Sequence, residues 1–218
     1  PSLPQAVLAT EDRRFYDHFG VDLIGLARAT VTNVRAVRIV QGGSTITQQV
    51  AKNLFLSSER TYKRKIQEVM LALWLEHRFS KDQILELYLN RVYLGAGTYG
   101  VDAAARKYFS RPASQLNVWQ SAMLAGLLKA PSRYNPHNSD TRATDRTRVV
   151  LANMVAAGYL SESDAKKARS LSSKRKAVRP GQIAPHFVDW VLDYVSDYVG
   201  ARDRDLFVQT TLDSKVQI

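Results

Sequence analysis

The clearest local structure is predicted by the stretch Gly42-Gly43-Ser44-Thr45-Ile46-Thr47-Gln48-Gln49-Val50-Ala51-Lys52-Asn53. Two adjacent glycines break the preceding periodicity and let the backbone turn with positive φ close to a ligand. Thr45 is followed three residues later by Gln48, which matches the capping box found at helix starts. The stretch therefore predicts a turn followed by a helix over about 46–55.

The predicted helix carries polar side chains along one face. Thr45, Gln48, Gln49 and Lys52 share this face by their i, i+3, i+4 and i+7 spacing. The free N–H groups at the start of a helix form a natural anion site. Such a face suits a phosphate with a polar group beside it. Taken alone, however, the stretch favours a capped helix with a polar outer face.

Helical periodicity runs through most of the chain, so the predicted fold class is mainly α. A loop is predicted at 95–100, an irregular connection at 131–136, and a strand only at 206–211. Helices are predicted over 5–19, 22–40, 46–55, 60–79, 81–93, 101–109, 118–128, 144–157 and from 162, where Ser161 is the cap.

Two of the predicted helices are distinctly amphipathic. In 22–40 the apolar residues recur at helical spacing between arginines, and in 60–79 they form an apolar stripe. The residues concerned are Leu23, Leu26, Ala27, Val31 and Val34 in the first helix, and Ile66, Val69, Met70 and Leu73 in the second.

The composition describes a basic globular chain. Hydrophobic residues make up 45% of its 218 residues and charged residues 23%, which suits one folded domain, or one domain and a fragment. Lys and Arg outnumber Asp and Glu by 31 to 20, a surplus that favours a polyanionic partner or a solubilising surface. The absence of cysteine excludes disulfides, thiolate zinc sites and a cysteine nucleophile.

The last part of the chain differs from the rest. A basic, Pro-Gly-containing stretch at 170–180 is typical of a linker, and the residues from 184 onward read as a helix and then a strand. We therefore divide the chain into a domain at 1–172 and a linker with a further segment at 173–218. Both ends of the chain read as interior sequence, which predicts a fragment of a longer protein.

Several short motifs carry little weight. The Gly95-x-Gly97-x-x-Gly100 pattern follows a helix rather than a strand and lacks the acidic residue of a dinucleotide site, so it predicts a loop. Ser163-x-x-Lys166 lacks the companion motifs of acyl-enzymes. The four histidines are scattered, so a zinc site is not expected.

Two charged clusters are more informative. Arg60, Lys63, Arg64 and Lys65 form a basic group opposed only by Glu59, and Glu68 lies one turn beyond Arg64. Arginines of this kind grip phosphate oxygens, although a solvated basic face is the common alternative. Residues 11–20 combine acids, bases and aromatics, and a carboxylate here would suit proton abstraction from a hydroxyl. A surface salt-bridge cluster is the alternative.

Taken in order, five segments resemble the motifs of one known family, the family 51 peptidoglycan glycosyltransferases. This family provides the polymerase module of class A penicillin-binding proteins and the monofunctional transglycosylases. The matching segments are 11–20 (EDRRFYDHFG), 42–53 (GGSTITQQVAKN), 64–73 (RKIQEVMLAL), 81–90 (KDQILELYLN) and, more loosely, 148–154 (RVVLANM). Five motifs in the right order make a specific signal, whereas no single one would.

The resemblance implies a lysozyme-like helical glycosyltransferase domain. In the family, the region of 22–40 is a mobile, membrane-facing lobe that admits the lipid, so its apolar residues would meet acyl chains. The segments at 184–188 and 210–213 are similar to the passage into a transpeptidase domain. The resemblance therefore implies a bifunctional parent, with its transpeptidase domain and N-terminal membrane anchor missing here.

The resemblance also implies the reaction. The family polymerises lipid II into β-1,4-linked glycan with inversion and release of polyprenyl diphosphate. Glu11 matches the general base, held ionised with the help of Arg13 and Arg14. Glu68 matches a second catalytic glutamate near the diphosphate, acting through a divalent cation, Mg or Mn. The residues expected to bind substrate are Ser44, Thr45, Gln48, Gln49, Lys52, Asn53, Arg60, Arg64 and Lys65.

The expected partners follow from the same resemblance. They are lipid II, the growing glycan chain, the inner-membrane surface and the inhibitor moenomycin, with no nucleic acid and no organic cofactor. The expected location is the bacterial cell envelope, on the periplasmic face of the cytoplasmic membrane. The excess of Lys and Arg over Asp and Glu would then bind diphosphates and anionic lipid headgroups.

Three alternatives stay open. A lysozyme-like glycan hydrolase also needs a glutamate in a glycan cleft, but it has no diphosphate to require the dense positive face. A nucleic-acid-binding protein with a helix-turn-helix at 81–109 would use the net charge of +11, yet gives no role to Glu11 and Glu68. A catalytically silent scaffold would not need the full set of motif acids and bases.

Overall fold

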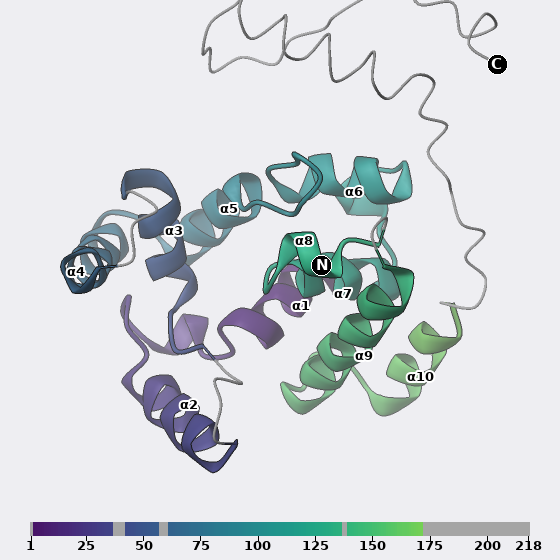
Figure 1. Cartoon of the computed structure of the whole chain (residues 1–218), viewed down its shortest axis with the longest axis horizontal. Helices are drawn as coiled ribbons and strands as arrows, with labels where there is room; N and C mark the ends of the chain where they lie inside the picture. The colour runs from purple at the N-terminus through teal and green to yellow at the C-terminus, as the bar shows by residue number, and fades with distance from the viewer. Residues whose placement is uncertain (1, 37–41, 57–60, 137–138, 172–218) are drawn as a thin grey trace, which may run out of the picture. The chain divides into compact units, whose positions relative to one another are not determined.

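The computed structural model describes residues 2–36, 42–56, 61–136 and 139–171, which form a helical domain (Figure 1). Within these ranges there is no extended strand, only isolated bridges between Phe19 and Val21 and between Tyr93 and Tyr99. The mainly α class is therefore confirmed. The predicted linker, the strand at 206–211 and Arg60 lie outside the described residues.

Ten α-helices and two short 3-10 helices make up the described part of the chain. In chain order they are α1 (Ser2–Glu11), η1 (Phe15–Asp17), α2 (Leu23–Ala36), α3 (Ile46–Phe55), α4 (Tyr62–Arg78), α5 (Lys81–Arg91), α6 (Val101–Phe109), η2 (Ala113–Gln115), α7 (Val118–Leu127), α8 (Pro131–Tyr134), α9 (Asp140–Ala156) and α10 (Glu162–Ser170).

One group of helices packs around α7. This helix is apolar on all sides and buried from Ser121 to Leu127, and it contacts both α1 and α9. A helix with apolar residues all round is stable only when it is enclosed. Asn117 and Gln120 close a capping box at its start. The helix α7 therefore forms the centre of the core, with α1 and α9 against it.

A second group consists of α3 packed on α4 and α5. The predicted capping box is confirmed, because Thr45 accepts from the Gln48 N–H and the Gln48 side chain accepts from the Thr45 N–H. A buried polar link ties the three helices together. The Glu76 carboxylate accepts from the Thr47 hydroxyl at 2.6 Å and from Lys81 Nζ at 2.7 Å. Such a link holds α3 in one position relative to α4 and α5.

Gly20 lets the chain cross close to α4. It has a φ of +76°, and a Cβ at this position would lie 3.1 Å from the Ala72 carbonyl carbon and oxygen. Its own carbonyl accepts from the Thr45 hydroxyl at 2.7 Å. Only glycine combines this backbone conformation with this close approach. The first sequence motif is thereby joined to both α3 and α4.

The expectation of positive φ at the glycine pair is wrong. Neither Gly42 nor Gly43 adopts the left-handed conformation, and the chain reaches Thr45 in an extended conformation. A Cβ at Gly43 would lie 2.7 Å from Leu26 Cδ1, whereas one at Gly42 would meet nothing within 4 Å. Gly43 therefore provides space beside α2, and neither glycine provides an unusual backbone angle.

Some helix boundaries also differ from the prediction. The helix predicted over 5–19 ends at Glu11, because the next residue, Asp12, directs its carboxylate to α3 and draws the chain away from the helix axis. The helix predicted over 144–157 begins already at Asp140, because the Ser139 hydroxyl accepts from the Arg142 N–H and caps it.

The apolar stripe of α4 does not face the core. Ile66 is 63% exposed and Met70 is 65% exposed, whereas Glu68 and Glu76 on the opposite side are buried. The apolar residues of α2 behave in the same way, since Leu23 is 72% exposed. Figure 1 shows α2 and α4 at the same end of the domain, away from α9 and α10. This end therefore carries large exposed apolar side chains.

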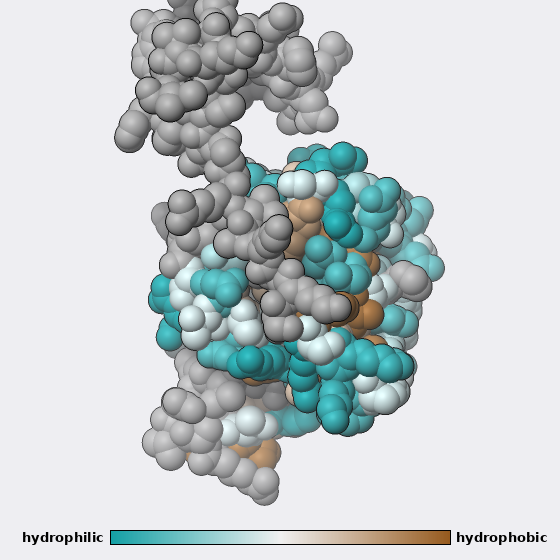
Figure 2. All heavy atoms as spheres, turned by 90° about the vertical axis from the view of Figure 1, so that its right-hand side faces the viewer, coloured by the Kyte–Doolittle hydropathy of each residue, from teal (hydrophilic) through white to brown (hydrophobic). Residues whose placement is uncertain are grey.

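The opposite side of the domain is mainly hydrophilic where it is described, with small apolar areas between the polar side chains (Figure 2). No helix in the described part of the chain is long and apolar enough to cross a membrane.

Candidate active site

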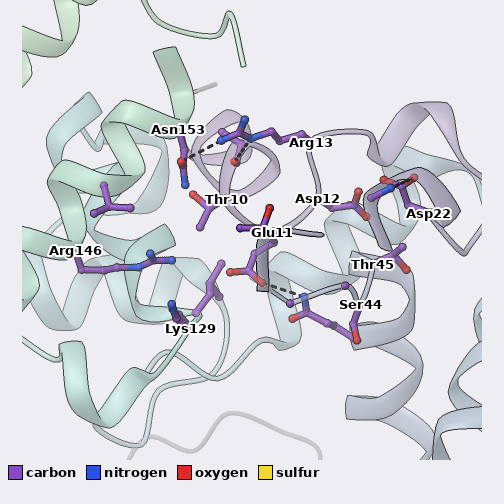
Figure 3. Close-up of a pocket in the computed structure, with 18 of the residues that line it drawn as sticks. Thr10, Glu11, Asp12, Arg13, Asp22, Ser44, Thr45, Lys129, Arg146 and Asn153 are labelled. Atoms are coloured by element: carbon purple, nitrogen blue, oxygen red, sulfur yellow. Dashed lines mark hydrogen bonds between the residues drawn. The ribbon is translucent and has the colours of Figure 1, made fainter. Parts of the chain in front are cut away.

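Glu11 is the last residue of α1 and lies where the two helix groups meet (Figure 3). Its carboxylate Oε2 accepts a hydrogen bond from Gln49 Nε2 of α3 at 3.1 Å. A cavity of about 850 Å³ opens in front of it. The lining includes Glu11, Asp22, Arg28, Gly42, Gly43, Ser44, Thr45, Gln49, Lys52, Lys129, Arg133, Tyr134, Arg142, Arg146 and Asn153.

Two opposing effects act on the Glu11 carboxyl group. Burial raises its pKa above the usual value, while the hydrogen bond from Gln49 and the charges of Arg146 and Lys129 lower it. The neighbouring Asp12 adds a smaller upward effect. Figure 3 shows Lys129 and Arg146 on one side of Glu11, with Ser44 and Thr45 on the other. The group is thus a carboxyl of raised basicity beside fixed cations.

The cations next to Glu11 are not those expected from the first motif. Arg13 binds the Ala9 carbonyl and Asn153, and Arg14 lies 3.9 Å from Asp22. Both guanidinium groups are therefore engaged by other partners. Arg146 and Lys129, which are distant in sequence, provide the positive charge that acts on Glu11.

The start of α3 is occupied by a carboxylate of the chain itself. Asp12 Oδ2 accepts from the Ile46 N–H at 3.0 Å, and both Asp12 oxygens lie within 3.1 Å of His18 Nε2. The side chains of Asp12 and His18 are 3% and 4% exposed. The anion site expected at this helix start is thus partly filled by Asp12, which instead fixes α3 against the end of α1.

The expected substrate-binding residues at the start of α3 and within it differ in whether their side chains reach the cavity. Gln49 and Lys52 line the cavity. Thr45 also lines it, but its hydroxyl and the Gln48 side chain are used in capping and in the bond to Gly20. Asn53 is exposed and does not line this cavity. The helix thus presents an amide and an ammonium group to the cavity.

A smaller cavity of about 160 Å³ lies beside the first, between α3 and α4. Lys65 Nζ donates to the Ser44 hydroxyl and to Glu68 Oε2, both at 2.8 Å, and Arg64 Nε lies 3.1 Å from Glu68 Oε1. Lys52 borders both cavities. The structure therefore brings together five residues of the expected site, which are Ser44, Lys52, Arg64, Lys65 and Glu68.

The surroundings of Glu68 do not fit a divalent cation held by the protein alone. Among the described residues that line the smaller cavity, Glu68 is the only carboxylate, and two cationic side chains already pair with it. The described residues contain no cluster of three His, Asp or Glu side chains that could hold a metal ion. A divalent cation at Glu68 stays a prediction.

Sequence reasoning missed the part of the site that comes from α7–α9. Lys129, Arg133, Tyr134, Arg142, Arg146 and Asn153 all line the cavity. Arg142, Arg146, Val149 and Asn153 lie at helical spacing on α9, so they share one face. This spacing could have predicted a functional face on the helix. Arg142 and Arg146 come just before the motif at 148–154, and Val149 and Asn153 lie within it.

The site thus combines a basic carboxyl group with cations on two sides, as expected of an enzyme that transfers a sugar from a phosphate leaving group. A profile of the family described as transglycosylase matches residues 1–155. The chain therefore belongs to the transglycosylase family, and it is a peptidoglycan glycosyltransferase domain of the class A penicillin-binding protein type.

Its relatives are longer proteins. Penicillin-binding protein 1A of Aquifex aeolicus is 45% identical over 97% of this chain, and penicillin-binding protein 1A of Escherichia coli is 42% identical over 100%. The matched regions span 30% and 26% of those two proteins. The crystal structure of penicillin-binding protein 1A from Haemophilus influenzae matches 71% of this chain and 21% of its own, at 29% identity and a TM-score of 0.44.

Proposed function

We propose that this domain polymerises lipid II into β-1,4-linked glycan with inversion, and that Glu11 is the general base. The observation that carries the proposal is the position of Glu11, between the cations of α7–α9 and those of α3 and α4. The residues are Lys129 and Arg146 on the first side, and Lys52, Arg64 and Lys65 on the second.

The chemistry follows from this arrangement. The ionised Glu11 takes the proton from the 4-hydroxyl of the acceptor sugar, and that oxygen attacks the anomeric carbon of the donor. The bond from this carbon to the diphosphate oxygen breaks, and the polyprenyl diphosphate leaves with the bonding electrons. Because a diphosphate leaves as an anion, its charge needs neutralisation more than its oxygen needs a proton. Lys52, Arg64 and Lys65 supply this neutralisation.

The position of Glu11 also favours separate places for donor and acceptor. The diphosphate that leaves belongs beside Lys52 and the smaller cavity. The acceptor, which carries its own diphosphate, then extends toward Lys129, Arg133 and Arg146. The base lies between the two groups of cations, where the acceptor hydroxyl and donor carbon must meet. Moenomycin, which mimics the lipid-linked donor in this family, is expected to bind on the Lys52 side.

The reaction class can be tested with labelled lipid II in detergent. The 218-residue chain is expected to produce a ladder of glycan polymer on a gel and to release polyprenyl diphosphate. A glycan hydrolase would instead leave lipid II unpolymerised and release soluble muropeptides from preformed glycan. That result, together with an absence of moenomycin binding, would overturn the proposed function in favour of a lysozyme-like hydrolase.

We further propose that the domain works on the periplasmic face of the bacterial cytoplasmic membrane. Its support is the end of the domain formed by α2 and α4, where apolar side chains face outward. They include Leu23, Ile24, Val34, Ile66, Met70 and Trp74, which are 47–72% exposed. Large exposed apolar areas of this kind mark sites of contact with a membrane or another protein. Contact with acyl chains places the cavity beside the lipid-linked substrate.

Replacing Ile66 and Met70 together with serine is expected to weaken binding to vesicles of anionic phospholipid. The two side chains are exposed, so their loss removes apolar surface without opening a hole in the core. Leu171→Ser removes an exposed apolar side chain elsewhere and serves as the control. Co-sedimentation with vesicles measures the effect. Unchanged binding of the double variant would rule out α4 as a membrane contact.

A further inference from the structure

A chain of two hydrogen bonds runs from α5 through α3 to Glu11. The Tyr88 hydroxyl donates to Gln49 Oε1 at 3.1 Å, and Gln49 Nε2 donates to Glu11 Oε2 at 3.1 Å. Tyr88 is 1% exposed and lies in the hydrophobic core beside the buried residues of α5. Its hydroxyl is therefore the polar end of a core side chain, directed to the amide that contacts the proposed base.

The direction of these bonds is fixed by chemistry. An ionised carboxylate only accepts hydrogen bonds, so Gln49 must present its NH₂ group to Glu11 and its oxygen to Tyr88. The tyrosine hydroxyl then has to donate. Burial and the negative charge of Glu11 raise the pKa of Tyr88 well above its usual value, which keeps that proton in place. A flipped amide would set its oxygen against the carboxylate.

We propose that Tyr88 is a positioning residue for the glycosyl transfer, which holds the Gln49 amide in the one orientation that donates to Glu11. This inference rests on the proposed role of Glu11 as the base. Without the Tyr88 hydroxyl, the Gln49 oxygen loses the donor that holds it away from the carboxylate, so the preference for the donating orientation of the amide weakens. The donated bond would then be lost for part of the time.

Three charged groups also affect the pKa of Glu11, but they do so without a hydrogen bond to it. Arg146 of α9, Lys129 after α7 and Asp12 after α1 act through their charge. Their effect does not depend on which way the Gln49 amide points. Burial raises the pKa of Glu11 and the Gln49 bond lowers it, so losing that bond moves the pKa upward. A higher pKa leaves less ionised base at a given pH.

Tyr88→Phe tests the proposal because it removes one oxygen and keeps the ring that fills the core. The matched control is Tyr108→Phe, since Tyr108 is also buried and donates its hydroxyl to the Leu94 carbonyl at 3.0 Å, outside both cavities. The Glu11 carboxyl carbon is followed by ¹³C NMR over a pH titration and is assigned by its absence in Glu11→Gln. Thermal unfolding of both tyrosine variants records any general loss of stability.

The expected result is an upward shift of the Glu11 titration in Tyr88→Phe and none in Tyr108→Phe. The acidic limb of the pH profile of kcat shifts to higher pH as well. At pH values on this limb, kcat falls by about tenfold, which is the usual effect of losing a hydrogen bond to a charged group. KM changes little. An unshifted titration in Tyr88→Phe overturns the proposal, whatever the activity.

A double-mutant cycle with Gln49→Met checks that Tyr88 acts through the amide. In the Gln49→Met background, Tyr88→Phe is expected to have no further effect on the Glu11 titration. An equal shift in both backgrounds would overturn the proposal. A different result would contradict the proposed role of Glu11 as the base. If the Glu11 titration shifts but the pH profile of kcat does not, Tyr88 does position the amide, but Glu11 is not the base.

Discussion

Glu11→Gln is expected to lower the rate of lipid II polymerisation by about 10³-fold, the usual cost of losing a general base. The amide has nearly the shape of the carboxyl group but cannot take a proton from the acceptor hydroxyl. The cations that hold the diphosphate remain, so moenomycin binding is expected to survive. A gel-based polymerisation assay on the 218-residue chain, with binding measured in parallel, checks both statements.

A matched control is available on α5. Glu86 is exposed and borders neither cavity, so Glu86→Gln makes the same chemical change away from the site. Its polymerisation rate is expected to equal that of the unchanged chain. Polymer formed equally by Glu11→Gln and the unchanged chain would leave the family membership intact and remove Glu11 from the role of base.

The same substitution is expected to stabilise the fold. The pKa of Glu11 is raised in the folded state by burial, so the folded chain binds more protons than the unfolded chain between the two pKa values. Stability therefore falls as the pH rises through this interval, and at neutral pH the ionised Glu11 is a cost to folding. Glu11→Gln removes that cost, so its melting temperature at neutral pH should exceed that of the unchanged chain. Residues placed for catalysis commonly carry such a cost.

The local structure of α3 was readable from its sequence, because a capping box depends only on residues three apart. Thr45 and Gln48 make the two predicted bonds. The partners that give Gln49 its role are Glu11 and Tyr88, which are separated from it by 38 and 39 residues. No local pattern encodes contacts of that kind. The motifs therefore located the candidate residues but not the bonds between them.

The amphipathic pattern of α4 shows a second limit of sequence reasoning. Periodicity identifies an apolar face, but it does not show which face meets the core. In α4 the buried positions include Glu68 and Glu76, each paired with a cation. Burial of carboxylates is tolerated only with such partners. The exposed apolar face and the buried acids both fit the proposed position of α4, between a charged cavity and a lipid surface.

Asp12→Ala is expected to give the second large effect, a loss of about 3 kcal/mol of folding stability, since one partner of a buried network is removed. The carboxylate joins the end of α1, the start of α3 and His18, and it accepts the hydrogen bond from the Ile46 N–H. Urea unfolding followed by circular dichroism measures the change. Asp102→Ala, which removes a half-exposed carboxylate from the start of α6, is the control and should cost much less.

Asp12→Ala is also expected to reduce polymerisation in the fraction that stays folded, because the start of α3 is held against Glu11 through this carboxylate. The stability and polymerisation rate of Asp12→Asn should lie between those of the unchanged chain and those of Asp12→Ala. In this variant one oxygen can still accept from the Ile46 N–H, while the NH₂ group faces His18. An Asp12→Ala variant with unchanged stability would show that water or another group replaces the carboxylate. An unstable variant with full activity at low temperature would show that Gln49 reaches Glu11 without the Asp12 anchor. The expected order, with stability and activity falling together, would establish Asp12 as the residue that sets the distance between the base and α3.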